Sequence, residues 1–164
     1  MLSKVLHCST LILGCGNPLF GDDGFGPAVI DHLLSRYTLP DPVAAVDVGT
    51  GMGSFLVDLL LFPQKPRRIF ILDAVSDSDR RPGEIFELPL SSLTGKDTTV
   101  ITLHEFPSAQ VLQELEQQAG VKVHILVVQA QSIPKEVSPG LSPPVLEAVS
   151  QASLWLYRQV EEEP

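Results

Sequence analysis

Three apolar runs constrain the fold of this chain more than any other feature of its sequence. They lie in STLIL (9–13), RRIFILDAV (67–75) and VKVHILVVQA (121–130). A strand that is apolar along most of its length is buried on both faces, which is typical of a parallel sheet covered by helices. We therefore expect these runs to form the centre of such a sheet.

Segments with helical periodicity alternate with the strands, and two further segments have strand character. The expected helices are PAVIDHLLSRY (27–37), SFLVDLLLF (54–62), SAQVLQELEQQAG (108–120) and SPPVLEAVSQASLWLYRQVEEE (142–163). VAAVDVGT (43–50) reads as a second strand, and GEIFELPL (83–90) reads as an edge strand because Pro89 is tolerated there. This order predicts an α/β fold with a mostly parallel five-stranded sheet, an antiparallel edge and helices on both faces. No linker or repeat interrupts residues 1–164, so we expect a single domain.

Composition excludes several classes of function. The formal net charge of −9 argues against a nucleic-acid partner, which requires a basic surface. No run reaches the roughly 18 apolar residues that a membrane span needs, so we expect no membrane association. The N-terminal segment lacks the apolar core of an export signal, which predicts a cytoplasmic protein whose two cysteines are reduced. We also expect a monomer.

The glycine-rich segment LGCGNPLFGDDGFG (13–26) follows the first strand and raises the question of what it binds. The dinucleotide fingerprint fails here because Leu19 stands where the third glycine is required. Asp22 and Asp23 would also repel a pyrophosphate. Asp before a helix most often caps it, but Pro27 suits the first helical position, which would place the cap at Gly26. We then expect both acids to be solvated loop carboxylates outside the carboxyl end of the first strand, where α/β sheets bind ligands.

Two other polar residues fall at comparable places. Asp47 closes the second strand, and His104 lies in the loop segment TLHEFPS (102–108). Taken singly, such an Asp is usually a turn former and such a His is usually solvated. Together with Asp23 they would form a plausible set of ligands for a divalent transition metal, with coordination positions left open.

Five motifs in this order closely resemble those of the hydrogenase maturation endopeptidases. They are LILGCGNPLFGDDGFG, VDVGTG, ILDAV, LHEFPS and GLSPPVLEAV, and together they span nearly the whole chain. The resemblance implies a three-layer α/β/α sandwich around a twisted, mostly parallel sheet. It also implies a nickel-dependent endopeptidase that removes the C-terminal extension of a nickel–iron hydrogenase large-subunit precursor after nickel insertion.

The resemblance further implies which residues contact the metal. The metal-contacting positions of the family map onto Asp23, Asp47 and His104, and the nickel is carried by the precursor rather than bound permanently. Asn17 and Asp22 belong to the same glycine-loop motif. Asp73, in ILDAV, matches another acidic motif position, although turn capping is the simpler explanation of that residue.

Two routes to hydrolysis remain open. A metal shared with cysteines of the precursor would polarise the scissile carbonyl or lower the pKa of a water. Alternatively, nickel only docks the peptide, and Asp22, Asp23 or Glu105 acts as the base. Cys15 is not expected to be a nucleophile, because neighbouring carboxylates raise the pKa of a thiol. A rival function is a non-enzymatic, nickel-binding maturation chaperone for the same partner.

Overall fold

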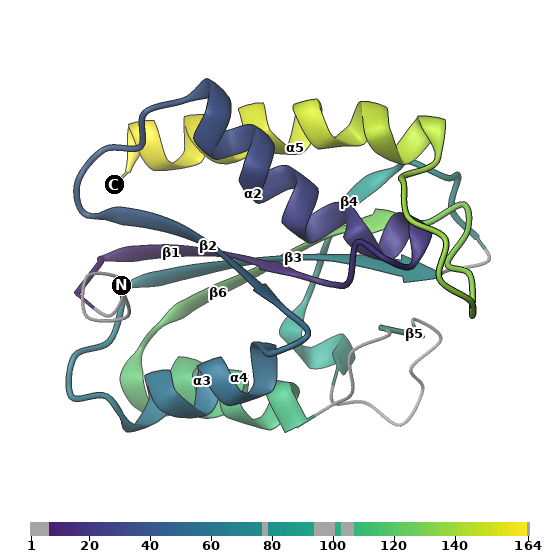
Figure 1. Ribbon diagram of the computed structural model, residues 1–164. Helices are drawn as coiled ribbons and strands as arrows, with labels where there is room; N and C mark the ends of the chain where they lie inside the picture. The colour runs from purple at the N-terminus through teal and green to yellow at the C-terminus, as the bar shows by residue number, and fades with distance from the viewer. Residues whose placement is uncertain (1–6, 77–78, 94–100, 103–106, 164) are drawn as a thin grey trace.

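A central sheet lies between two layers of helices in the computed structural model, which describes residues 7–76, 79–93, 101–102 and 107–163. The helices α2 (Phe25–Arg36) and α5 (Pro143–Glu162) cover one face of the sheet, and α3 (Met52–Leu61) and α4 (Pro107–Ala119) cover the other (Figure 1). The fold is therefore the three-layer α/β/α sandwich that the sequence predicts. None of the helices in these residue ranges is both long and apolar enough to cross a bilayer.

The sheet is mostly parallel and ends in an antiparallel edge. Its strands are β1 (Thr10–Cys15), β2 (Val43–Gly49), β3 (Arg68–Ser76), β4 (Ile85–Leu88), β5 (Ile101–Thr102) and β6 (Lys122–Gln129). Five of them follow the order β2-β1-β3-β6-β4, in which only β4 runs antiparallel to its neighbour. The two-residue strand β5 pairs with the end of β3, off this path. The predicted strands and their edge are thus confirmed, whereas β5 was not anticipated because two residues carry no periodicity.

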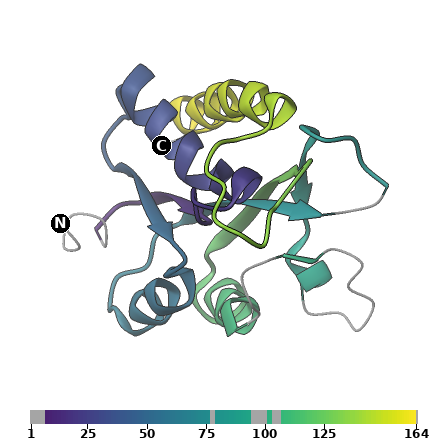
Figure 2. The ribbon, with the colours of Figure 1, turned by 45° about the vertical axis from the view of Figure 1, so that its right-hand side comes forward.

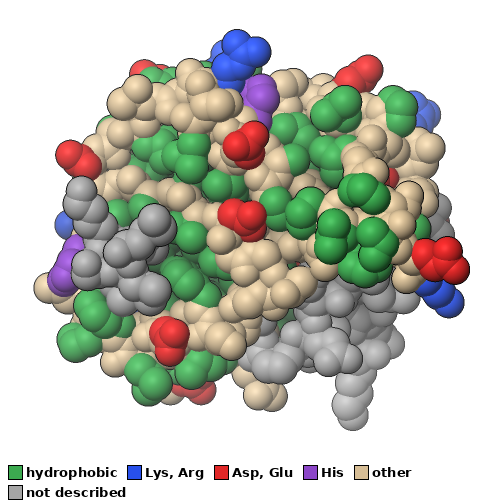
Figure 3. Space-filling view, viewed as in Figure 1, with side chains coloured by type: hydrophobic (Ala, Val, Ile, Leu, Met, Phe, Trp, Pro, Cys, Tyr) green, Lys and Arg blue, Asp and Glu red, His purple; other side chains and the backbone are tan. Residues whose placement is uncertain are grey.

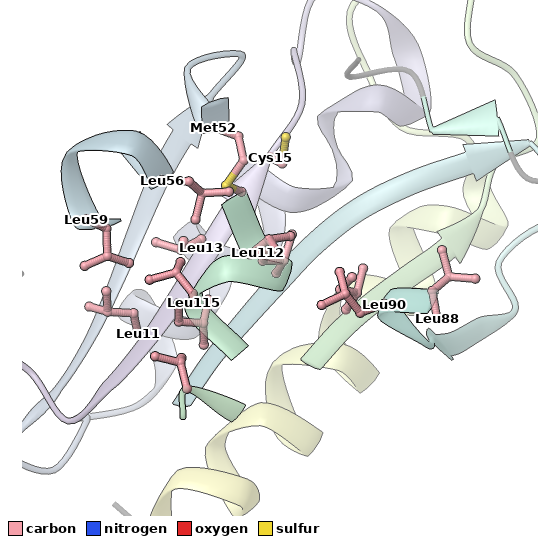
Figure 4. Packing of buried hydrophobic residues seen from close by; sticks show 14 of the residues in the cluster. Leu11, Leu13, Cys15, Met52, Leu56, Leu59, Leu88, Leu90, Leu112 and Leu115 are labelled. Carbon is pink, nitrogen blue, oxygen red and sulfur yellow. The ribbon is translucent and has the colours of Figure 1, made fainter. Parts of the chain in front are cut away.

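Alternating side chains of the strands divide the core into two clusters. Leu11, Leu13 and Cys15 of β1 point toward α3 and α4, where they pack beside Met52 and Leu56 (Figure 4). Ile12, which lies between Leu11 and Leu13 in the strand, packs on the other face, where α2 and α5 lie. Apolar side chains on both faces explain why the central strands read as continuous apolar runs.

Two glycines allow α2 to lie directly on the sheet. A methyl group added to Gly26 would come 2.2 Å from the carbonyl oxygen of Cys15, and one added to Gly14 would come 2.7 Å from the carbonyl oxygen of Gly26. No Cβ is tolerated at such distances from backbone atoms. The first turn of α2 is therefore held in backbone contact with the carboxyl end of β1.

The start of α2 differs from the prediction. The helix begins at Phe25 with Gly24 as its N-cap, and the short 3-10 helix η1 (Gly21–Gly24) precedes it. Pro27 is thus the third residue of the helix, and the expectation of a cap at Gly26 was wrong by two residues. Proline is tolerated throughout the first turn because the backbone N–H groups there have no partner within the helix.

Candidate functional site

The segment between β1 and α2 lies at the carboxyl edge of the sheet and is bonded to the loop that follows β6. Gly21 N–H donates to the carbonyl of Ser138 at 2.9 Å, and Ser138 N–H donates to the carbonyl of Leu19 at 2.8 Å. Figure 2 shows this later loop passing beside the first turn of α2. Two segments far apart in the sequence therefore form one end of the molecule.

Asp22 makes most of the side-chain contacts between these segments. Its Oδ2 accepts hydrogen bonds from the backbone N–H groups of Gln131 at 2.8 Å and Ser132 at 2.9 Å. Ser142 donates twice, from its backbone N–H to Oδ1 at 2.7 Å and from its hydroxyl to Oδ2 at 2.9 Å. The side chain of Asp22 is fully buried. Four donors on one buried carboxylate favour a structural role for Asp22 in shaping the site.

Asp23 is also buried but has a different neighbour. Its residue exposure is 5%, and its Oδ2 accepts a hydrogen bond from the backbone N–H of Asn17 at 2.9 Å. It does not cap α2, since the N-cap is Gly24 and no side chain bonds there. The prediction that the acids lie outside the helix is confirmed, and the prediction that they are solvated is wrong because the later loop covers this segment.

Gly16 allows the backbone of Asp23 to approach β1. Its φ is +128°, and a methyl group in place of its hydrogen would lie 1.9 Å from the carbonyl oxygen of Asp23. The same added carbon would lie 3.6 Å from Oδ1 of Asp23. The carboxylate of Asp23 is therefore held directly beside Gly16, at the carboxyl end of β1.

Asp47 reaches the same place from the neighbouring strand. Its residue is exposed, and its Oδ1 accepts a hydrogen bond from the backbone N–H of Gly49 at 2.8 Å. Gly49 in turn accepts a hydrogen bond from the N–H of Gly16 at 3.1 Å, which connects the two strand ends. Asp23 and Asp47 thus flank the contact between Gly16 and Gly49, one carboxylate buried and the other open to solvent.

Cys15 lies among the acids of this edge. Burial is the main factor that raises the pKa of its thiol, and the charges of Asp73, Asp23 and Asp47 raise that pKa further. A thiol with a strongly raised pKa stays protonated and is a poor nucleophile. The interpretation of Cys15 as a packing residue is therefore supported by both its burial and its neighbours.

Asp73 occupies an interior position of β3, where it pairs with Val127 of β6. Only 6% of this residue is exposed, and its Oδ1 accepts a hydrogen bond from the N–H of Ala74 at 2.8 Å. The explanation as a turn cap was wrong, because β3 continues beyond this residue to Ser76. A buried acid within a strand near Cys15 instead adds to the negative charge of the carboxyl edge.

Two predicted site residues, His104 and Glu105, lie outside the described residues. Among the residues that the structure does describe, no three His, Cys, Asp or Glu side chains are arranged to hold a metal ion. Asp23 and Asp47, two of the predicted ligands, lie at one edge of the sheet, and the third predicted ligand is His104. The metal site therefore stays a prediction.

Sequence reasoning missed the loop from 131 to 142, which carries every donor to Asp22. Its residues form no motif, and the hydrogen bonds come mainly from backbone N–H groups, which any residue except proline provides. The only usable signal is Ser142 before Pro143, which is typical of a helix start. In the structure Ser142 is indeed the N-cap of α5, but its hydroxyl bonds to Asp22 instead of the helix.

Comparisons with known proteins agree with this architecture. The family model described as hydrogenase maturation protease matches residues 27–158. The Hydrogenase 2 maturation protease of Escherichia coli is 30% identical over 88% of this chain and 85% of its own length. The coenzyme F420 hydrogenase subunit delta of Methanothermobacter thermautotrophicus is 34% identical over 87% of this chain and 88% of its own. The solved structure of the hydrogenase maturating endopeptidase HybD from E. coli superposes with a TM-score of 0.76 at 26% identity, covering 93% of this chain and 92% of that one.

Proposed function

This chain belongs to the hydrogenase maturation protease family, and on that premise we propose that it is the endopeptidase that removes a C-terminal extension from a nickel–iron hydrogenase large-subunit precursor. We propose that the precursor is cut after it has received its nickel. The observation that carries the proposal is the placement of Asp23 and Asp47 on either side of the contact between Gly16 and Gly49, in the fold of the family.

The nickel ion is part of the substrate in this proposal. Asp23 and Asp47 offer two carboxylates, of which one is open to solvent and accessible to a metal carried by a partner. Two ligands leave most coordination positions of a nickel ion to other groups, including those of the precursor. Such an incomplete donor set suits recognition of a metal that arrives already bound.

His104 is the third proposed metal contact. Thr102, two residues before it, pairs with Val75 near the carboxyl end of β3. Asp73 lies two residues earlier in the same strand and adds to the charge around Cys15. This pairing brings the chain to the acidic edge immediately before His104, which supports its assignment.

The three candidate bases differ in their surroundings. Four hydrogen bonds occupy the carboxylate of Asp22, so a proton transfer there would disrupt the loop that it supports. Asp23 lies beside Gly16 at the strand end, and Gly16 is bonded to Gly49, the neighbour of the exposed Asp47. We therefore favour Asp23 or Glu105 as the base and Asp22 as a positioning residue.

Exposed apolar side chains offer a surface for the precursor. Leu19 is 49% exposed and Val137 is 65% exposed, and their segments are joined by hydrogen bonds beside the acidic edge. Hydrophobic side chains gather at the right-hand end of the molecule in Figure 3, the end where these loops lie. Exposed apolar side chains that gather on one face are typical of protein interaction sites.

The proposal is tested by incubating the protein with a nickel-loaded large-subunit precursor and measuring the precursor mass. We expect loss of the C-terminal extension with the nickel-loaded precursor and no cleavage of the nickel-free one. Stable binding of the loaded precursor without cleavage would contradict the proposal and favour the maturation chaperone. An Asp47→Asn variant serves as the matched control. This exposed substitution leaves the fold intact, but it removes one proposed metal contact and should reduce cleavage.

A further inference from the structure

A basic pocket lies at the amino edge of the sheet, opposite the proposed site. It has a volume of about 370 Å³ and is lined by four cationic residues, Lys65, Arg67, Arg68 and Lys122, together with Glu163 and neighbouring backbone. Arg68 and Lys122 are the first residues of β3 and β6 and are paired in register. We call this site the amino-edge pocket.

The charge of this pocket is opposite to that of the whole chain. The chain has 11 Lys and Arg residues against 20 Asp and Glu, and four of those 11 line this one pocket. Its lining carries a net charge of +3, because Glu163 is its one acidic residue. The positive charges of this lining outnumber the negative charge within it. The pocket therefore has the electrostatics of an anion site.

Arg68 is the central group of the pocket. Only 6% of this residue is exposed, although burial of a guanidinium is costly unless strong partners compensate. Its hydrogen-bond acceptors within the described residues are distant: Oε2 of Glu163 lies 3.3 Å from Nη1, and the carbonyl oxygen of Gln159 lies 3.5 Å from Nη2. The Glu163 side chain is 69% exposed, so this ion pair contributes little. The guanidinium carbon of Arg68 lies 5.4 Å from the centroid of the Phe70 ring, within the range of a cation–π contact.

A second pocket extends the basic surface. It has a volume of about 340 Å³ and shares Lys65 and Arg67 with the first. Together the two pockets have the size of a small-molecule site, which typically spans roughly 300–1,000 Å³. The pockets therefore have room for an anionic group that is part of a small molecule, as well as for an inorganic anion.

We propose that the amino-edge pocket binds a phosphate group, either as free phosphate or as part of a small phosphorylated metabolite. Arg68 offers a planar fork of N–H donors that matches phosphate oxygens, and the lysines add point charges around it. Four cations against one carboxylate favour a dianion over a monoanion. The carboxylate of Glu163 occupies part of the position that the phosphate takes, so the two compete for Arg68.

The competition with Glu163 gives variants with opposite expected effects. Glu163→Gln removes the competing charge and should tighten phosphate binding about three- to tenfold. Lys122→Gln removes one attracting charge and should weaken binding by a similar factor. Lys135→Gln changes an exposed lysine of the loop at the opposite edge and should leave the affinity unchanged. All three side chains are exposed, so the variants are expected to fold.

The experiment titrates sodium phosphate into the purified protein at constant ionic strength, adjusted with sodium chloride, and follows the backbone amide signals by NMR. We expect saturable shifts that begin at Arg68, Gly120 and Lys122, with the order of affinity Glu163→Gln, wild type, Lys122→Gln. Parallel titrations with glycerol 3-phosphate and acetate distinguish the source of the anion. Tighter binding of glycerol 3-phosphate points to a metabolite, and equal binding of both phosphates points to the phosphate group alone.

Three results would overturn the proposal. They are acetate binding as tightly as phosphate, equal affinities in Glu163→Gln and Lys122→Gln, and amide shifts confined to the carboxyl edge. Precursor cleavage plays no part in these measurements, so their outcome is independent of the proposed protease function.

Discussion

The two edges of the parallel sheet carry opposite charge, and the charged residues of the two edges differ in burial. At the carboxyl edge, Asp22, Asp23 and Asp73 are buried, and each accepts a hydrogen bond from backbone N–H groups. At the amino edge the cations are largely exposed, and Arg68 is the buried one among those that line the pocket. These three acids of the carboxyl edge are therefore buried and hydrogen-bonded, whereas most of the basic residues of the amino edge are exposed or half-buried.

The direction of the helices explains the sign of each edge. In a parallel α/β sheet the helices begin at the carboxyl edge and end at the amino edge, as α5 does between Ser142 and Glu163. Helix N-termini favour negative groups and helix C-termini favour positive groups. The direction of the helices is thus consistent with acids at the carboxyl edge and cations at the amino edge. The acids of the carboxyl edge are the buried ones, and they depend on specific hydrogen bonds.

The largest effect is expected from Asp22→Ala. This change leaves three backbone N–H groups and one hydroxyl without their acceptor, at a cost of about 3 kcal/mol or more. Urea unfolding measures the loss. Lys122→Gln, which removes one exposed charge at the amino edge, should change stability by no more than about 0.5 kcal/mol. Similar losses in both variants would contradict the contrast between the edges.

The next effect concerns Asp23. Asp23→Asn keeps an oxygen that can accept the hydrogen bond from Asn17 but removes the charge, so precursor processing should fall at least about 100-fold with stability nearly unchanged. Asp23→Ala also removes the acceptor and should cost about 1–2 kcal/mol in addition. Cleavage is followed by mass spectrometry and stability by urea unfolding. Full processing by Asp23→Asn would show that the charge of Asp23 is not needed.

A smaller effect is expected from Asp47→Asn. The exposed side chain can still accept from Gly49 as an amide, so stability should stay within about 0.5 kcal/mol. Loss of one carboxylate should reduce processing about 10- to 100-fold. Unchanged processing in the same cleavage assay would restrict the proposed metal contacts to the buried side of the edge.

The smallest effect is the pH dependence contributed by Cys15. Burial and three nearby acids hold its pKa above that of an unfolded thiol, which is about 8.5. Below that pH both states keep the proton. Above it only the unfolded chain ionises, so this thiol lowers stability by up to about 1.4 kcal/mol for each further pH unit.

Comparison with Cys15→Ala isolates this contribution, because Cys8 is present in both proteins. Urea unfolding at pH 7.5 and pH 9.5 should show the wild type losing more stability than the variant. An equal loss in the two proteins would mean that the Cys15 thiolate is as well accommodated as in water.

Strands and helices with clear periodicity could be predicted from the sequence, and those without it could not. The apolar runs that became β1, β3 and β6 were identified because apolar residues on both faces leave an unbroken pattern. The start of α2 was misplaced because η1 supplies a turn that Pro27 alone does not reveal. Local patterns do not report such irregular turns.

The site shows the same division between local and long-range information. Asp23 was selected in the glycine-rich loop after the first strand and Asp47 at the end of the second, and parallel pairing of β1 with β2 brings these segments to one edge. The burial of Asp22 was not foreseen because its donors lie in a loop more than 100 residues away in the chain, 109 residues for Gln131 and 120 for Ser142. A single sequence contains no signal for that contact.

The same separation in the chain has a consequence for biosynthesis. A ribosome adds roughly 5–20 residues per second, so Asp22 leaves it many seconds before Ser142 does. Until then the nascent chain holds a carboxylate whose full set of hydrogen-bond donors has not yet been synthesised. The acidic edge is therefore assembled only when translation is nearly complete, and a truncated product that ends before α5 would lack an organised centre.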